Sequence, residues 1–139
     1  MKLRPPLQIL SWVLQTAAAL ILLQTLFFKF TGAKESIYIF SRLGAEPWGR
    51  IGSGIAELIV AILLLCPRTV TFGAIGAVMI MVGAIGAHLA VLGISVENDG
   101  GLLFGLALAV FLSGLILMVL HRQSLPLVGA RFTSPSIAR

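Results

Sequence analysis

The chain has 139 residues, of which 58% are hydrophobic and only 11% are charged. Soluble domains average roughly 45–50% apolar and about 25% charged residues. A small fold cannot bury such an excess of apolar surface. The composition therefore excludes a soluble domain and indicates a chain that lies in lipid. The net charge of +5 does not indicate nucleic acid as a partner, because the Lys and Arg residues are scattered through predicted loops and termini rather than gathered into a stripe.

Four stretches are apolar over the roughly 20 residues that a transmembrane helix needs. In chain order they cover residues 7–28, 48–66, 70–92 and 102–120. The first continues beyond the apolar core of a signal peptide, so we expect it to be retained as a helix. The sequence thus predicts an all-α membrane protein whose one domain, residues 1–122, is a bundle of four transmembrane helices.

The segment between the first and second stretches, residues 29–47, mixes apolar and charged side chains. Ile37 and Phe40 stand among the charges of Lys34 and Arg42, which predicts a short amphipathic helix that lies at the interface or folds back against the bundle as a re-entrant segment. Trp48 follows directly, and we expect it to anchor the start of the second helix at the membrane interface.

The distribution of Lys and Arg residues between the two sides of the membrane predicts the orientation. Six belong to the N-terminus, the turn after the second stretch and the C-terminal tail: Lys2, Arg4, Arg68, Arg122, Arg131 and Arg139. Four belong to the first and third connections: Lys29, Lys34, Arg42 and Arg50. The positive-inside rule then places both termini in the cytoplasm. The last residues, 123–139, follow no period and are expected to form a flexible basic tail.

Glu57 is the residue whose position is hardest to explain by packing alone. It lies nine residues from either end of the second apolar stretch, roughly 13 Å at 1.5 Å per residue, and therefore near the centre of the bilayer. An ionisable group at that depth costs a few kcal/mol and is by default a candidate functional site. The alternative is a carboxylate that only ties helices together by hydrogen bonds.

His88, near the outer end of the third stretch, is the natural partner for Glu57. By the helical rise it lies roughly 7 Å nearer the outer surface, a gap that side-chain reach or one water closes. Lys34 in the first connection and Asp99 in the third are expected on the same side. We therefore expect an outward-opening polar pocket whose candidate binding residues are these groups together with Trp48. A packed or interfacial histidine and solvated loop charges are the alternative interpretation.

A run of small residues is repeated within the third stretch. Residues 73–77, Gly-Ala-Ile-Gly-Ala, recur as residues 83–87, and a spacing of ten residues puts both runs on roughly one side of a helix. Small residues allow close approach of helices in lipid, so we expect tight packing inside the bundle, with a cavity as the alternative.

The sequence offers no familiar catalytic set and no metal site. It contains no phosphate-binding loop, no GxSxG elbow and no HExxH motif. Cys66 is the single cysteine, which excludes an internal disulfide or a CxxC relay. What the sequence provides is at most one buried acid–base pair.

Taken in order, several short motifs resemble the DoxX-like family of small bacterial membrane proteins. They are Phe30-x-Gly32-x-Lys34, Leu43-Gly44-x-Glu46-Pro47, Gly54-x-x-Glu57-Leu58, Ala87-His88, and the run from Leu92-Gly93 to Asp99-Gly100-Gly101. The resemblance implies a four-helix membrane bundle in the bacterial inner membrane, with Glu57, His88 and Lys34 at the family's characteristic polar positions. Family members include a subunit of a thiosulfate:quinone oxidoreductase, but the lone Cys66 departs from relatives that use cysteine pairs.

Three functions from different classes fit these observations. The first is a redox-associated protein, such as an accessory subunit of a membrane oxidoreductase, that binds a quinone or another small lipophilic molecule through Glu57 and His88. A quinone needs an apolar slot and proton-transfer groups. The second is a non-enzymatic partner or assembly factor that docks a membrane protein or a second copy of itself through its helix faces. A small transporter acting as an oligomer ranks last, because the sequence shows no inverted repeat.

Overall fold

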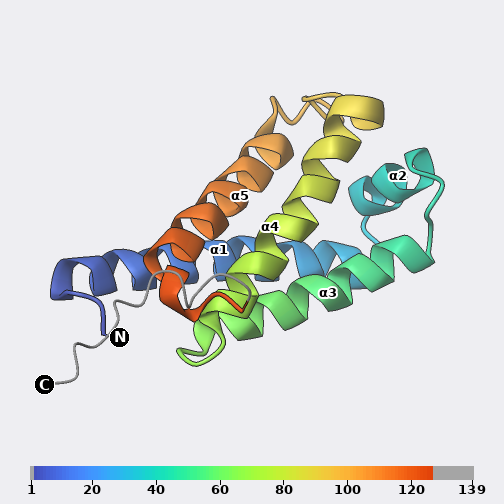
Figure 1. Cartoon of the computed structure of the whole chain (residues 1–139). Helices are drawn as coiled ribbons and strands as arrows, with labels where there is room; N and C mark the ends of the chain where they lie inside the picture. Colours follow the sequence, from blue (N-terminus) through green and yellow to red (C-terminus); the bar gives the residue numbers. More distant parts are fainter. Residues whose placement is uncertain (1, 127–139) are drawn as a thin grey trace, which may run out of the picture.

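Every regular element in residues 2–126, the part of the chain that the computed structural model describes, is a helix (Figure 1). The four long helices are α1 (Pro5–Thr31), α3 (Trp48–Leu65), α4 (Val70–Ala87) and α5 (Leu102–Leu120). The short ones are α2 (Lys34–Arg42), the π-helix η1 (His88–Leu92), which continues α4, and the 3-10 turn η2 (Arg122–Ser124).

All four predicted spans are confirmed, because each long helix is long and apolar enough to cross a membrane. The third span runs from Val70 to Leu92, since η1 prolongs α4. The predicted short helix between the first and second spans is also confirmed, as α2. Most of the segment predicted as a flexible tail, residues 123–139, lies outside the described residues.

The helices form two antiparallel pairs, α1 with α3 and α4 with α5, that cross each other at a large inclination (Figure 1). α3 also contacts α4, and α1 contacts α5, which joins the pairs. Towards the end where α1 finishes and α3 begins, the two pairs separate, and α2 lies between them (Figure 1). There α2 contacts α1, α3 and η1, so this short helix bridges the two arms of the bundle.

The centre of the bundle is built from small and aliphatic side chains. Ala61, Ala74 and Ala77 are fully buried, and Leu64 and Leu117 fill the space between them. Many large apolar side chains on the outer faces of the spans are exposed, which suits helices surrounded by lipid, because tails as apolar as leucine solvate them.

The two small-residue runs of α4 have different surroundings. An added Cβ on Gly73 would lie 2.6 Å from the backbone nitrogen of Leu64, and one on Gly76 would lie 2.7 Å from the side chain of Val60. Gly83 and Gly86, in contrast, are exposed and would place a Cβ in open space. The interpretation as tight internal packing is correct for the first run and wrong for the second, because α4 leaves α3 as the two helix pairs separate.

The contact between α4 and α3 can be tested with two matched substitutions. We expect Gly73→Ala to lower the free energy of unfolding by about 1–3 kcal/mol, because backbone atoms of α3 cannot move aside cheaply. Gly83→Ala is the control. Its added methyl meets no atom within 4 Å, and alanine has a higher helix propensity than glycine, so its free energy of unfolding should not fall. Unfolding in detergent micelles measures both, and equal stability of the two variants would contradict the packing described here.

Candidate functional site

A carboxylate, an ammonium and a hydroxyl meet where α1 faces α3. Glu57 is 5% exposed; its Oε1 accepts a hydrogen bond from Lys29 Nζ at 2.5 Å, and its Oε2 accepts one from Thr25 Oγ1 at 2.8 Å. Both donors come from α1, four residues apart and therefore on the same face of that helix. The two carboxylate oxygens are thus both satisfied, and the negative charge is paired within the bundle.

The ammonium of Lys29 is enclosed from the other side by α2. Its side chain is 14% exposed, against 6% for Glu57, and its Nζ lies 5.7 Å from the centre of the Phe40 ring. A cation at this distance from an aromatic face is attracted by the ring. α2 therefore covers the ion pair, as well as joining the two arms of the bundle.

Arg50 forms a second charged contact in the first turn of α3, about two helical turns before Glu57. Its Nε and Nη2 donate to the carboxylate of Glu46, at 3.0 and 2.8 Å, and its Nη1 donates to the backbone carbonyl of Lys29. That carbonyl belongs to the last turn of α1, where backbone acceptors have no partner in the helix. Arg50 thereby caps α1 and ties it to α3 beside the ion pair.

His88 takes a different partner from the one predicted. It is 6% exposed, its Nδ1 lies 2.8 Å from the backbone oxygen of Gly93, and its ring packs edge-to-face on Phe104 at 5.5 Å. Since a carbonyl only accepts, Nδ1 carries the proton and a neutral ring leaves Nε2 as an acceptor. The predicted direct pairing of Glu57 with His88 is wrong, because α1 supplies a stronger partner, a cation, on the face of α3 that bears Glu57.

Asp99 is occupied within the connection between η1 and α5. Its carboxylate accepts hydrogen bonds from the backbone nitrogens of Val96, Gly101 and Leu103, at 2.8–3.0 Å. These hydrogen bonds lower the pKa of the Asp99 carboxyl below its ordinary value, and the bond from the Leu103 nitrogen contributes most. Asp99 therefore organises the start of α5, and the structure does not bring it to Glu57.

Two further predicted site residues lie at the surface of the end of the bundle that bears α2. Lys34 begins α2 and is exposed, without an ion pair among the described residues. Trp48 begins α3 with 79% of its side chain exposed, a position that suits an anchor at the interface. The structure brings neither into contact with the ion pair.

Sequence reasoning did not assign Thr25 or Arg50 to the site, and it placed Lys29 in the first connection rather than in a span. Lys29 and Arg50 were counted with the loop charges, yet both lie in helices and are largely buried. Thr25 carried no signal on its own. The spacing of Thr25 and Lys29, which places them on one face of α1, is the signal that would have found them.

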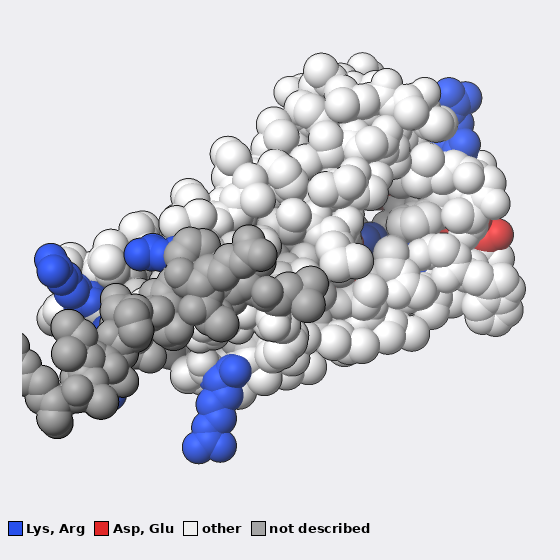
Figure 2. Space-filling model, in the orientation of Figure 1, with Lys and Arg blue, Asp and Glu red and all other residues white. Residues whose placement is uncertain are grey.

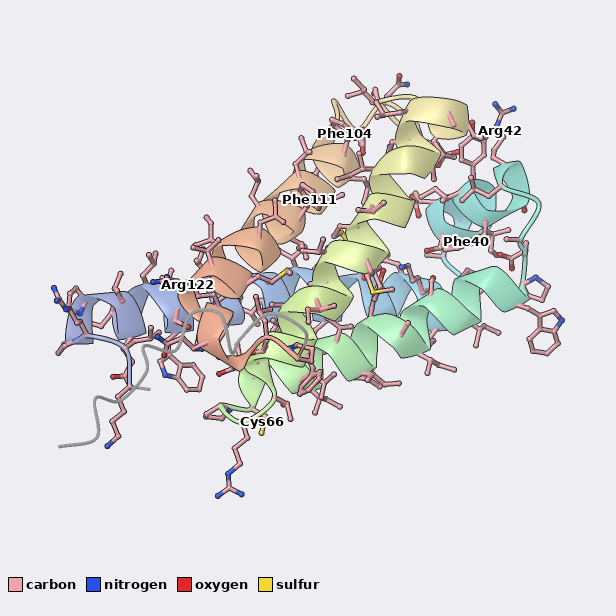
Figure 3. The ribbon with its side chains drawn as sticks, viewed as in Figure 1. Phe40, Arg42, Cys66, Phe104, Phe111 and Arg122 are labelled. Carbon is pink, nitrogen blue, oxygen red and sulfur yellow. The ribbon has the colours of Figure 1, made fainter. Side chains whose placement is uncertain are left out.

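The surface is hollowed beside this site. Figure 2 shows an opening between α4 and α2 with a basic side chain visible inside it. Figure 3 places Phe40 and Phe104 at this end of the molecule and Cys66 at the opposite end, in the turn between α3 and α4. The exposed thiol of Cys66 is therefore remote from the ion pair. Within residues 2–126, no three His, Cys, Asp or Glu side chains gather as metal ligands.

Four apolar spans with a charged network enclosed at one end define a small multi-pass membrane protein with a buried polar site. The model of the DoxX-like family matches residues 13–115, most of the chain, so the protein belongs to that family. No curated protein and no solved structure matched the chain.

The coupling between Lys29 and Glu57 is open to a double-mutant cycle. We expect Lys29→Met or Glu57→Gln alone to cost about 3–5 kcal/mol, because each leaves the other charge buried without a partner. The double variant should recover most of the stability that either single variant loses. Unfolding in detergent measures all three proteins, and simple additivity of the two single losses would contradict the pairing.

Proposed function

We propose that the protein binds a small lipophilic molecule with a polar, carbonyl-bearing head, of the quinone class, at the α2 end of the bundle. The head would lie at Lys29 and Glu57, and the apolar part between α2 and α4. The observation that carries the proposal is the ion pair itself, enclosed in a span beside an opening in the surface.

The energetics of the pair favour a role beyond holding helices together. Removing two charges from water costs several kcal/mol per ion, and well-packed apolar residues often stabilise a fold as well or better. Lys29 and Glu57 are therefore an expensive way to join α1 and α3. Charged groups in membrane spans commonly mark substrate or proton pathways.

The chemistry of the pair suits a carbonyl compound. An ammonium has three N–H donors, of which Lys29 directs one to Glu57. Another can donate to a carbonyl oxygen of a bound quinone, and the neighbouring carboxylate can accept the hydroxyl proton of the quinol when a separate electron acceptor oxidises it. His88 supports the proposal, since it begins a π-helix, an irregularity found frequently at functional sites, and its Nε2 can accept a proton from a hydroxyl.

This proposal connects the protein with redox chemistry through its ligand, because a quinone is a redox-active molecule. The proposal assigns to the chain the binding of a quinone and proton exchange at its head. Thiol–disulfide chemistry forms no part of it, because Cys66 is the single cysteine and lies at the opposite end.

Binding of decylubiquinone to the full chain in lipid nanodiscs tests the proposal. We expect saturable binding above that of empty nanodiscs, and an affinity reduced at least tenfold in the double variant Lys29→Met/Glu57→Gln, since a hydrogen bond to a charged group contributes about 1.5–3 kcal/mol. The double variant is preferred because it keeps no unpaired buried charge.

The matched control is Arg42→Met/Glu35→Gln, which removes one cation and one carboxylate from exposed positions of α2. This protein should bind as the unaltered chain does. Binding that does not exceed partition into empty nanodiscs, or that survives loss of the ion pair, would refute the proposal.

A second candidate function is docking of another membrane protein or a second copy of the chain. It is favoured by the exposed run of small residues on α4, where Gly83 and Gly86 leave open space. These two residues lie three apart on one helix face, and such a face allows another span to approach closely.

Replacement of Gly83 by leucine tests this second candidate. After chemical cross-linking in native membranes, we expect Gly83→Leu to reduce the yield of a co-purifying protein or of a dimer. Gly105→Leu is the control, since Gly105 on α5 also has open space around it. Equal yields from the two variants would speak against the docking face.

We also infer that both termini face the cytoplasm of a bacterial cell, with the spans in its plasma membrane. The structure removes Lys29 and Arg50 from the loop charges, because both lie inside helices and pair with carboxylates. This leaves Lys34 and Arg42 on the α2 side, which sharpens the difference on which the positive-inside rule depends.

A further inference from the structure

The charges of the described residues are distributed unequally between the two ends of the bundle. At the end where α1 begins, α3 turns into α4 and α5 finishes, the described residues include four cations: Lys2, Arg4, Arg68 and Arg122. The five carboxylates of the chain all lie between residues 35 and 99, on α2, on α3 or in the connections at the α2 end. No Asp or Glu side chain therefore belongs to that end of the bundle, and basic side chains stand out there (Figure 2).

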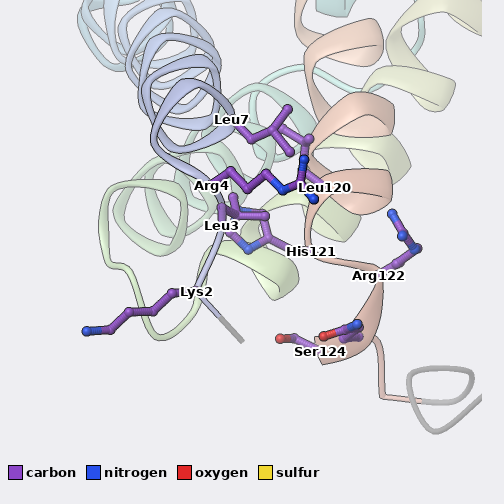
Figure 4. A pocket seen from close by; sticks show the side chains of 9 residues that line it. Lys2, Leu3, Arg4, Leu7, Leu120, His121, Arg122 and Ser124 are labelled. Carbon is purple, nitrogen blue, oxygen red and sulfur yellow. The ribbon is translucent and has the colours of Figure 1, made fainter. Parts of the chain in front are cut away.

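At that end a pocket of about 160 Å³ lies between the start of α1 and the end of α5. Its walls include Arg4, Leu7, Leu120, His121 and Arg122, and no lining residue is acidic. Figure 4 shows Arg4, the residue before α1, extending towards Leu120 and passing over the ring of His121, while Lys2 points away. A guanidinium therefore spans the opening between two helices.

The floor of the pocket is held by hydrogen bonds between the same two helices. His121 Nε2 lies 2.9 Å from Ser11 Oγ, which also accepts a hydrogen bond from Gln15 Nε2 at 2.6 Å. Ser11 and Gln15 are fully buried. The histidine, at the end of α5, is thereby tied to α1, so the pocket is built on fixed elements rather than on the ends of loose loops.

The combination of Arg4 with leucine walls matches an ester of phosphate attached to an apolar chain. A guanidinium can donate two hydrogen bonds to one phosphate, and Leu7 and Leu120 offer apolar contact directly beside it. The pocket also lies at the ends of two spans, the depth at which the phosphates of a bilayer lie. Basic pockets between spans on the cytoplasmic side are recognised sites for anionic lipid headgroups.

We propose that the pocket between Arg4, the residue before α1, and the end of α5 binds the phosphate of an anionic phospholipid, with the first part of an acyl chain against Leu7 and Leu120. The site is separate from the ion pair of Lys29 and Glu57, which lies nearer the other end of the bundle. A free phosphate ester offers the same anionic group without the chain, and the test distinguishes the two.

Native mass spectrometry of the purified, delipidated full chain measures the binding directly. We expect phosphatidylglycerol to bind more tightly than phosphatidylcholine with the same acyl chains. Arg4→Gln should weaken phosphatidylglycerol binding about fivefold, the effect of one cation near a membrane surface. Arg4→Lys, which keeps the charge, should retain most of the affinity for phosphatidylglycerol.

Arg68→Gln is the matched control, because it removes the same charge from the same end but from the α3–α4 turn, outside the pocket. Its affinity for phosphatidylglycerol should stay close to that of the unaltered chain, and the melting temperature of each variant shows that it is folded. Equal losses in Arg4→Gln and Arg68→Gln would overturn the proposal in favour of diffuse attraction. Equal binding of phosphatidylcholine, or displacement of the lipid by glycerol phosphate at a similar concentration, would overturn it as well.

Discussion

The arrangement of the bundle depends on the need to pair one charge in a medium that does not solvate it. Glu57 lies near the middle of α3, and in lipid its charge must be met by protein. Lys29 and Thr25 meet it from one face of α1, which fixes both the rotation of that helix and its height relative to α3. Arg50 then closes the end of α1 through the carbonyl of Lys29, and the ring of Phe40 brings α2 over the ammonium. A single buried carboxylate thus organises three helices.

The rest of the bundle follows from where helices can approach closely. Gly73 and Gly76 allow α4 to contact the backbone and side chains of α3. Farther along α4 that contact ends, because the two helix pairs diverge and α2 lies between them. The divergence leaves the hollow beside the ion pair and also exposes Gly83 and Gly86. Small residues therefore produce contact at one end of the bundle and open space at the other.

Much of the fold could be predicted from the sequence, because the length of each apolar stretch reports directly on whether it can span lipid. The four spans and the short α2 are of this kind, and so is the burial of Glu57, which its central position in a span requires. The partner of Glu57 could not be predicted in this way. It depends on how two helices are rotated about their axes, which a single sequence does not report. Lys29 was assigned to a loop because the first apolar stretch was taken to end before this charge, whereas α1 continues through it. Arg50 was counted with the loop charges although it lies in the first turn of the second stretch.

The ion pair also bears on the order in which the spans enter the membrane. A helix that carries a central carboxylate is poorly suited to lipid on its own, whereas Lys29 lies near the end of α1 and its long side chain can reach the interface. Because α1 precedes α3 in the chain, synthesis delivers the cation to the membrane first. The carboxylate of α3 therefore enters the membrane after its counter-ion, Lys29, is already there. The direction of translation thus relieves the most difficult insertion step, and a chain with the two helices in the reverse order would lose that advantage.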